Sequence, residues 1–235
     1  MSDAPSSRRD VGVVIVAAGS GSRTGSSELK QFRWVAGKPM LLHSVQAFQA
    51  RPDVAMVTVV LPRGYAGDPP PWLFQSDLER LLISVGGAER GDSVRHGMED
   101  LPGDVEIIVV HDAARPLVTD ATIDAVIATA RTGVGAIAAL PVHDTLKRVD
   151  AEGGITETID RRAIWRAQTP QAFPAAMITD AYRRARAELA SATDDAALCE
   201  RYGHRVVVVP GSERAMKVTT EEDFARAEAL SMLRG

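Results

Sequence analysis

Several kinds of residue are scarce in this chain of 235 residues, and each scarcity excludes a class of protein. The single cysteine, Cys199, excludes an internal disulfide and any metal site built from several cysteines. No run approaches the roughly 18–20 apolar residues of a membrane-spanning helix, and the N-terminus lacks the apolar core of a signal peptide. A formal charge of −4 offers nucleic acid or an acidic membrane no general basic field. We therefore expect a cytoplasmic protein whose partners include neither nucleic acid nor a membrane.

Lysine is also scarce, because only four of the 27 basic residues are lysines. Most basic residues of this chain are arginines, so each lysine is a candidate for a specific role: Lys30, Lys38, Lys147 and Lys217. A lone lysine is usually a solvated surface charge. A functional role therefore has to come from the motif around it.

Short apolar segments alternate with amphipathic helical patterns along the chain. The apolar segments are rich in β-branched residues, which is typical of strands buried on both faces of a parallel sheet. Strands are predicted at Val11–Val16, Val54–Leu61, Leu81–Val85, Val105–Val110, Val134–Leu140 and Arg205–Val209. Helices are predicted around Leu41–Phe48 and Ile123–Ala130, from Pro174 to Leu189, from Thr193 to before Gly203, and after Thr219, with Glu222 completing a capping box. The pattern predicts an α/β protein with a mostly parallel sheet, with residues 1–10 as a disordered tail and 11–235 as one domain.

One segment, Val142 to Trp165, breaks this rhythm. It is polar and alternating, with "EGG" at its centre, and predicts a two-stranded β-hairpin arm. An isolated hairpin is only marginally stable in water. We therefore expect this arm to pack on a second subunit, so that the protein is a homodimer.

The first predicted strand runs into a glycine loop, in "VGVVIVAAGSGSRTGSSELKQF" from Val11 to Phe32. A dinucleotide fingerprint needs a third glycine where Thr24 stands, and the second strand does not end on an acidic residue. A Walker A loop needs Gly-Lys-Ser/Thr, but Gly25 is followed by two serines. Backbone N–H groups of a Gly/Ser loop can still approach a polyphosphate closely, with Arg23 and Lys30 as cations beside it. The loop alone is compatible with a phosphate site or with a structural turn.

The order of several motifs is more specific than any one of them. "AAGSGSR…LKQF", "GGAERGDSVRHG", "HDAARP", "PVHDTLKR", "DRRAIWRAQTPQAF" and "MKVTTEEDF" follow one another along the chain. As a set they resemble the 2-C-methyl-D-erythritol 4-phosphate cytidylyltransferases of the non-mevalonate isoprenoid pathway, from about Val11 to Leu233. The resemblance implies a Rossmann-like nucleotidyltransferase three-layer sandwich. It also implies transfer of a cytidylyl group from CTP to a polyol phosphate, with release of pyrophosphate.

The resemblance implies two sets of binding residues. CTP is expected on the triphosphate loop, on the cytosine-reading loop and at the "HDAARP" motif: Ala17, Ala18, Gly19, Ser20, Gly21, Ser22, Gly86, Gly87, Arg90, Ser93, Asp112 and Ala113. The polyol phosphate is expected on Asp112, Arg115, Thr145, Arg161, Thr169 and Lys217. For Arg90 a phosphate contact or a solvated position is open, and for Arg115 a substrate contact or a bond to Asp112. Thr145 and Arg161 lie on or beside the arm, so they serve either their own site or the partner's.

Arg23, Lys30, Lys217 and Arg161 are the catalytic candidates that the resemblance implies. In-line attack on an α-phosphate spreads negative charge over the phosphate oxygens, and fixed cations offset that charge. Mg²⁺ is expected to be held mainly by the CTP phosphates, with Asp112 as a candidate protein ligand. His111 is interpreted as structural, because a phosphate monoester is already ionised near neutral pH and needs no general base.

Three alternatives remain at this stage. Ribitol 5-phosphate cytidylyltransferase shares much of the motif set and differs in the alcohol pocket. A non-catalytic nucleotide-binding module would share the fold, although the two cations Arg23 and Lys30 argue for catalysis. An NAD-binding reductase is disfavoured by the misplaced third glycine.

Overall fold

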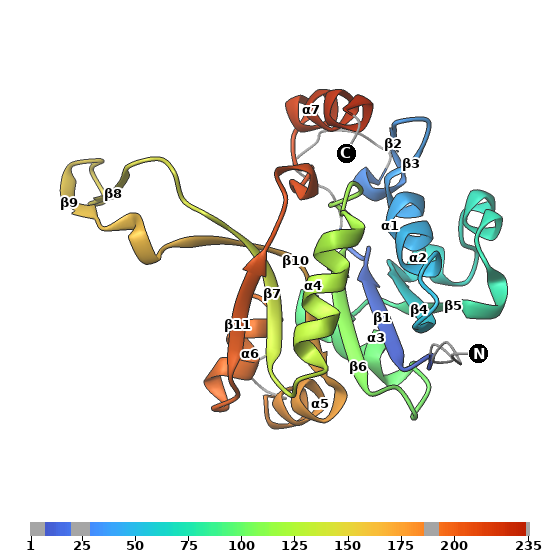
Figure 1. Cartoon of the computed structure of the whole chain (residues 1–235). Helices are drawn as coiled ribbons and strands as arrows, with labels where there is room; N and C mark the ends of the chain where they lie inside the picture. The colour runs from blue at the N-terminus through green and yellow to red at the C-terminus, as the bar shows by residue number, and fades with distance from the viewer. Residues whose placement is uncertain (1–7, 20–28, 186–192, 234–235) are drawn as a thin grey trace, which may run out of the picture.

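A seven-stranded sheet forms the centre of the computed structural model, which describes residues 8–19, 29–185 and 193–233 (Figure 1). Its strand order is β11-β7-β10-β6-β1-β4-β5. The strands are β1 (Val11–Val16), β4 (Val54–Leu61), β5 (Leu81–Val85), β6 (Ile107–Asp112), β7 (Gly135–Pro141), β10 (Trp165–Pro174) and β11 (Val206–Pro210). All neighbouring pairs are parallel except those of β10, which is antiparallel to both β6 and β7. The predicted mostly parallel sheet is confirmed.

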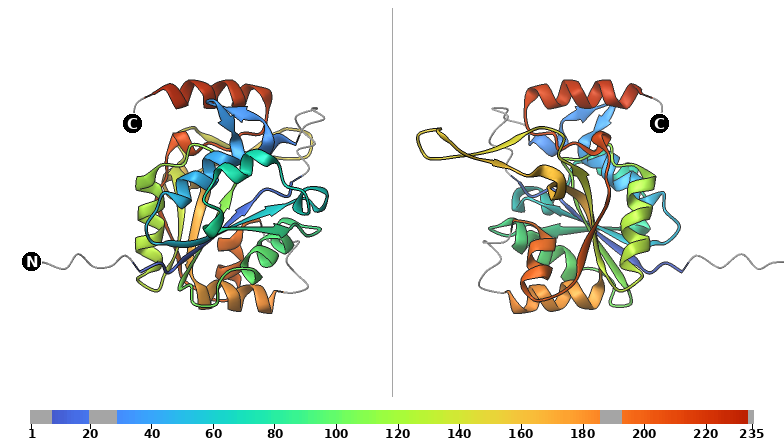
Figure 2. Two further views of the ribbon diagram at one scale, coloured as in Figure 1. Left: turned by 90° about the vertical axis from the view of Figure 1, so that its right-hand side faces the viewer. Right: turned by 60° about the vertical axis from the view of Figure 1, so that its left-hand side comes forward.

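Helices cover both faces of this sheet and make it the middle of three layers (Figure 2). They are α1 (Met40–Gln49), α2 (Arg63–Ala66), α3 (Arg90–Glu99), α4 (Asp120–Ala130), α5 (Ala175–Arg184) and α6 (Asp195–Arg201). The last helix, α7 (Glu221–Met232), lies beyond the end of the sheet, where Phe224 packs with Val35 and Met40 (Figure 1). Because side chains alternate along β1, Val13 and Ile15 pack against α1 and α4, whereas Val14 packs in the core formed with α3, α5 and α6. None of the helices in the described ranges is long and apolar enough to cross a membrane.

Strand β10 was not predicted from the sequence. It carries arginine, glutamine, threonine and two prolines, which normally argue against a central strand. The structure accommodates Pro170 where the pairing with β7 is irregular, between Ala167 and Gln171. The part of β10 from Gln168 to Phe173 is nevertheless buried, because it fills the space between β6 and β7.

Both chain ends differ from the prediction in detail. The tail does not extend to residue 10: Asp10 is buried and its carboxylate accepts a hydrogen bond from Arg131 Nη2 at 2.6 Å. Residues 1–7 lie outside the described ranges. At the other end, α7 is capped by Thr220 together with Asp223, one residue later than the predicted Thr219 and Glu222. The stretch predicted to continue α5 to Leu189 lies outside the described residues beyond 185.

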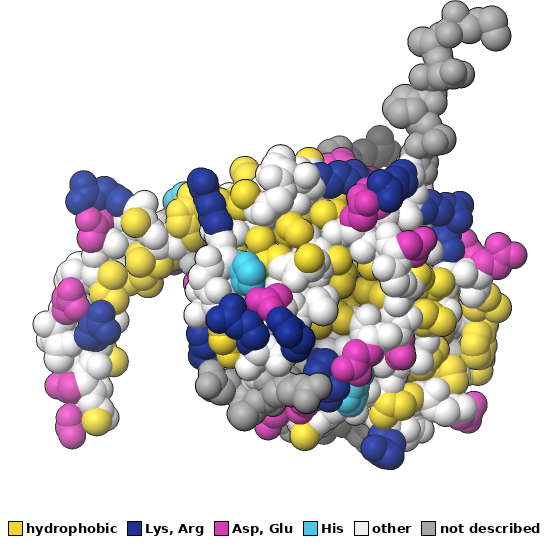
Figure 3. Space-filling model, turned by 90° about the horizontal axis from the view of Figure 1, so that it is seen from below, with side chains coloured by type: hydrophobic (Ala, Val, Ile, Leu, Met, Phe, Trp, Pro, Cys, Tyr) yellow, Lys and Arg dark blue, Asp and Glu magenta, His cyan; other side chains and the backbone are white. Residues whose placement is uncertain are grey.

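The arm is the two-stranded ribbon that the sequence predicts, with β8 (Leu146–Val149) antiparallel to β9 (Ile155–Ile159). Gly153 permits its turn, with φ of 85°. Figures 1 and 3 show the arm standing clear of the sheet and its helices. Apolar side chains are exposed on it and at its base, namely Val149, Ile155, Ile164 and Trp165.

Candidate active site

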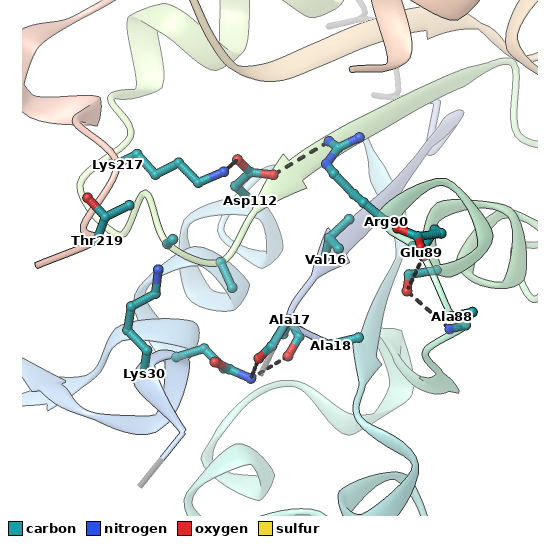
Figure 4. A pocket seen from close by; sticks show the side chains of 16 residues that line it. Val16, Ala17, Ala18, Lys30, Ala88, Glu89, Arg90, Asp112, Lys217 and Thr219 are labelled. Atoms are coloured by element: carbon teal, nitrogen blue, oxygen red, sulfur yellow. Dashed lines mark hydrogen bonds and ion pairs between the residues drawn. The ribbon is translucent and has the colours of Figure 1, made fainter. Parts of the chain in front are cut away.

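A cavity of about 520 Å³ lies at the carboxyl ends of β1 and β6. In a parallel α/β sheet this edge is where ligands bind. The walls come from the ends of the two strands, the start of α3, the segment around Lys30 and the segment that leads into α7. Lys30 and Lys217 enter the cavity from two segments far apart in the sequence (Figure 4). The site therefore combines residues from both ends of the chain.

Asp112, the last residue of β6, is the charged centre of this cavity. Its Oδ2 accepts a hydrogen bond from Lys217 Nζ at 2.8 Å, and its Oδ1 lies 3.5 Å from Arg90 Nη2. Arg115 Nε is 3.9 Å from Oδ2. Burial opposes ionisation of the carboxyl, but Arg90 and Lys217 outweigh it and hold the pKa of Asp112 well below its usual range. Asp112 is therefore a carboxylate at neutral pH.

His111 and Thr169 support Asp112 from behind. The Asp112 amide donates to Thr169 Oγ1 at 3.0 Å, and His111 Nδ1 lies 3.2 Å from that oxygen. His111 Nε2 lies 3.1 Å from the Arg115 carbonyl, which can only accept, so we assign the proton to Nε2 and let Nδ1 accept from Thr169. Burial lowers the pKa of His111 to about 4. The ring is thus a neutral structural group.

The "GGAERGDSV" segment approaches the chain just after β1 closely, because it begins with Gly86. A Cβ on Gly86 would lie 2.3 Å from Ala18 Cβ. The Gly87 amide donates to Ser93 Oγ at 3.1 Å, and that hydroxyl donates to the Glu89 carbonyl at 3.2 Å. Ser93 therefore holds the loop in place as well as lining the cavity. Glu89 and Asp92 form a capping box at the start of α3.

Gln31 is a site residue to which sequence analysis gave no role. Its Nε2 donates to the Ala17 carbonyl at 2.6 Å and to the Gly19 carbonyl at 3.2 Å. These bonds fix the path of the chain as it leaves β1, at the edge of the cavity. The only signal in the sequence was its position directly after Lys30, in the "LKQF" motif.

The structure brings many of the predicted CTP residues together. The cavity is lined by Ala17, Ala18, Gly19, Gly87, Arg90, Ser93, Asp112 and Ala113, along with Lys30 and Lys217. The Arg90 guanidinium is paired with Asp195 at the cavity wall, and its contact with a CTP phosphate stays a prediction. Ser20, Gly21, Ser22 and Arg23 lie outside the described residues.

The predicted polyol phosphate residues separate into three groups. Lys217 lines the cavity, whereas Arg115 and Thr169 are buried beside Asp112. The Arg115 side chain donates to the Ala215 carbonyl at 2.8 Å, so it joins the "HDAARP" loop to the segment before Lys217. Thr145 and Arg161 are exposed at the arm and do not line this cavity. Within one chain, the site lacks these two residues.

A magnesium ion would find one suitable ligand here. The described part of the chain holds no cluster of three or more His, Cys, Asp or Glu side chains arranged for a metal. Asp112 is an ionised carboxylate facing the cavity, and Mg²⁺ is commonly held by one or two carboxylates together with substrate phosphates. The donor set fits a cation whose other ligands come from a nucleotide.

The mostly parallel sheet, and the cavity at its carboxyl edge that is lined by two lysines and an ionised aspartate, define an α/β protein of the nucleotidyltransferase class. The sequence profile of the 2-C-methyl-D-erythritol 4-phosphate cytidylyltransferase family matches residues 11–233. The chain belongs to this family and is a nucleotidyltransferase.

Relatives agree with this assignment along nearly the whole chain. The 2-C-methyl-D-erythritol 4-phosphate cytidylyltransferase of Salinibacter ruber is 42% identical over 93% of this chain and 91% of its own length. A bifunctional enzyme IspD/IspF of Rhodospirillum rubrum is 45% identical over 94% of this chain, which covers 56% of that protein. The crystal structure of the cytidylyltransferase from Thermus thermophilus superposes with a TM-score of 0.80 at 34% identity, covering 95% of this chain and 100% of that one.

Proposed function

We propose that this chain transfers the cytidylyl group of CTP to 2-C-methyl-D-erythritol 4-phosphate, giving 4-diphosphocytidyl-2-C-methyl-D-erythritol and pyrophosphate. The observation that carries the proposal is the cavity at the carboxyl edge of the sheet, where Lys30 and Lys217 enter beside an ionised Asp112. Such cations suit a reaction that concentrates negative charge on phosphates. The family to which the chain belongs bears this activity in its name.

The reaction is a direct displacement at phosphorus. A phosphate oxygen of the polyol phosphate attacks the α-phosphorus of CTP, and the bond from that phosphorus to the oxygen bridging to the β-phosphate breaks. Pyrophosphate leaves with the electron pair. Backbone donors of the loop after β1 bind the triphosphate, and Lys30 together with Arg23 offsets the charge of the transition state. Lys217 holds the attacking phosphate near the α-phosphate.

We infer a role for Mg²⁺ in this reaction. Bound to the CTP phosphates, the ion would supply positive charge that neutralises the triphosphate and the leaving group. Asp112 is the side chain that would hold it, because it is ionised and faces the cavity. Lys217 shares that carboxylate, so the lysine and the ion would both be positioned by Asp112.

We propose further that the protein is a homodimer through its arm. The arm exposes Val149 and Ile155 to solvent, at 55% and 66%, and side chains of this kind are usually covered. Thr145 and Arg161 do not reach the cavity of their own chain, and in a dimer they would complete the partner's polyol phosphate site. Light scattering during gel filtration measures the mass directly.

A cytoplasmic location fits an enzyme that consumes CTP.

The decisive experiment compares two alcohols. Pyrophosphate release is measured with CTP and Mg²⁺ together with either 2-C-methyl-D-erythritol 4-phosphate or ribitol 5-phosphate. We expect kcat/KM to be at least about 100-fold higher with the methylerythritol phosphate. A preference for ribitol 5-phosphate would make the chain a ribitol 5-phosphate cytidylyltransferase. If neither alcohol gives pyrophosphate, the chain would instead be a nucleotide-binding module without catalysis.

A further inference from the structure

Asp195 is a buried carboxylate directly behind the cavity. It is in the first turn of α6, and none of its surface is exposed to solvent. Arg90 donates to it through both terminal nitrogens, Nη1 to Oδ1 at 3.1 Å and Nη2 to Oδ2 at 2.8 Å. The Tyr182 hydroxyl donates to Oδ1 at 2.5 Å. Asp195 and Arg90 thus form a bidentate ion pair, the geometry that fixes an arginine most strongly.

Arg90 stands between two carboxylates. The same Nη2 that binds Asp195 at 2.8 Å is 3.5 Å from Oδ1 of Asp112. The shorter contacts belong to Asp195, so Asp195 sets the position of the guanidinium and keeps it from closing on Asp112. As a result, Arg90 approaches only Oδ1 of Asp112, and Oδ2 is left in direct contact with Lys217.

We propose that Asp195 is a positioning residue for the cytidylyl transfer, acting through Arg90 on Asp112 and Lys217. Because Asp195 holds Arg90 at the cavity wall, the Asp112 carboxylate stays available to bind Lys217 and groups of the bound substrates. The inference rests on the proposed function, because it concerns residues that line the same cavity.

The position of Asp195 is fixed independently of Arg90. Gln171 of β10 donates to Asp194 Oδ2 at 3.0 Å and accepts from the Ala196 amide at 3.1 Å. The same strand carries Thr169, which accepts the amide hydrogen of Asp112. The start of α6 and the end of β6 are therefore both hydrogen-bonded to β10. These bonds to one strand fix the distance between Asp195 and Asp112.

Stability alone does not explain this buried ion pair. Taking both charges out of water is costly, and a packed apolar pair is often as stable or more so. Burial opposes the charged form of Arg90, yet Asp195 and Asp112 together raise its pKa above the usual range. Arg90 is thus a permanent cation at the cavity wall. Its two acidic neighbours have distinct effects, because Asp195 holds it in place and Asp112 faces the substrates.

Asp195→Asn is the informative substitution, because asparagine keeps the size of the side chain and removes its charge. Of the two carboxylates beside Arg90, Asp112 alone then keeps its charge. We expect the guanidinium to move onto Asp112 and to compete with Lys217. Displacing catalytic groups by a fraction of a bond length lowers rates strongly, so we expect kcat to fall about 10- to 100-fold.

The test compares Asp195→Asn, Arg90→Gln and the double variant. Each is assayed for kcat and for the KM of both substrates, well below its own unfolding midpoint. If Asp195 acts through Arg90, the losses do not multiply, and the double variant is no slower than the slower single variant. Arg90→Gln leaves Asp195 buried without its cation and could fail to fold. In that case Arg90→Lys replaces Arg90→Gln, because lysine keeps the charge but not the paired geometry. Asp10→Asn is the matched control: Asp10 is also a buried carboxylate paired with an arginine, Arg131, but it does not line the cavity, so we expect wild-type kcat.

Two results would overturn the inference while leaving the proposed function intact. One is a wild-type kcat in folded Asp195→Asn protein. The other is a double variant whose loss is the product of the single losses, which would mean that Asp195 acts independently of Arg90. A wild-type protein that releases no pyrophosphate from CTP would instead overturn the proposed function. The two failures are therefore distinguishable.

Discussion

Lys217 Nζ lies 2.8 Å from Oδ2 of Asp112, although the two residues are separated by 105 positions. The bond joins the segment before α7 to the carboxyl end of β6, and both residues line the cavity. It also helps to keep Asp112 ionised, as Arg90 does. Lys217 thus has two effects, since it contributes a cation to the site and stabilises the charge of the aspartate beside it.

Lys217→Gln should therefore lower the rate of cytidylyl transfer. We expect kcat to fall about 100-fold or more, by analogy with removal of a transition-state donor. The rate falls because the site loses a cation that faces the phosphates, while Arg90 still keeps the pKa of Asp112 low. Lys38→Gln is the control, because Lys38 binds Gln46 and does not line the cavity. Equal losses in the two variants would contradict a specific role for Lys217.

The close approach of Gly86 to Ala18 predicts an effect on CTP binding. An alanine at Gly86 would place its Cβ 2.3 Å from Ala18 Cβ and 3.2 Å from the Leu61 carbonyl oxygen. Either the glycine loop or the chain after β1 has to move, so we expect the KM for CTP to rise about ten-fold or more. Gly64→Ala is the matched control, because an added Cβ there meets nothing within 4 Å. Unchanged CTP binding in Gly86→Ala would place the nucleotide away from this contact.

The strands whose bounds could be predicted best are those whose sequence is almost entirely apolar. The predicted bounds Val11–Val16, Val54–Leu61 and Leu81–Val85 are those of β1, β4 and β5. β1 and most of β4 are buried between helical layers, which dictates their composition, whereas β5 is half-buried at the edge of the sheet. β10 could not be predicted in this way, because its buried polar residues are satisfied by partners from distant segments. Gln171, for example, is bonded to the start of α6.

The site was predictable to the extent that its residues lie in contiguous motifs. Lys30, Asp112 and Lys217 were identified within such motifs, and all three line the cavity. The pairing of Arg90 with Asp195 was not, because it depends on two elements that only the folded sheet brings together. Likewise, the bond from the Asp112 amide to the buried Thr169 hydroxyl could not be predicted, and the expected contact of Thr169 with substrate stays a prediction.

The proposed dimer predicts that two defective variants can restore each other. Arg161→Ala should mainly raise the KM for the polyol phosphate, and Lys30→Ala should lower kcat. If Arg161 serves the partner's site, a mixed dimer of the two variants has one site with both residues intact. Random mixing should then recover about a quarter of wild-type activity at low polyol phosphate concentration. If Arg161 serves its own chain, mixing recovers nothing.

His111 predicts a pH dependence of stability. It has no exposed surface, packs edge-on against Phe48, and has its pKa lowered to about 4 by burial. Its ordinary pKa is about 6.5, so below that pH the unfolded chain binds a proton that the folded chain does not. Stability is therefore fully present above pH 6.5 and is lost as the pH falls toward 4, by roughly 3 kcal/mol from this group.

Urea unfolding at pH 7, 6 and 5 measures this loss, at one protein concentration because of the proposed dimer. His111→Gln should be less stable than wild type at pH 7, because it gives up the bond from Thr169 Oγ1 to Nδ1 and the contact with Phe48. Its stability should nevertheless fall less steeply between pH 7 and pH 5, because no buried imidazole resists protonation. His143→Gln removes an exposed ring at the base of the arm and should keep the wild-type slope. Parallel slopes for wild type and His111→Gln would show that His111 is not the group responsible.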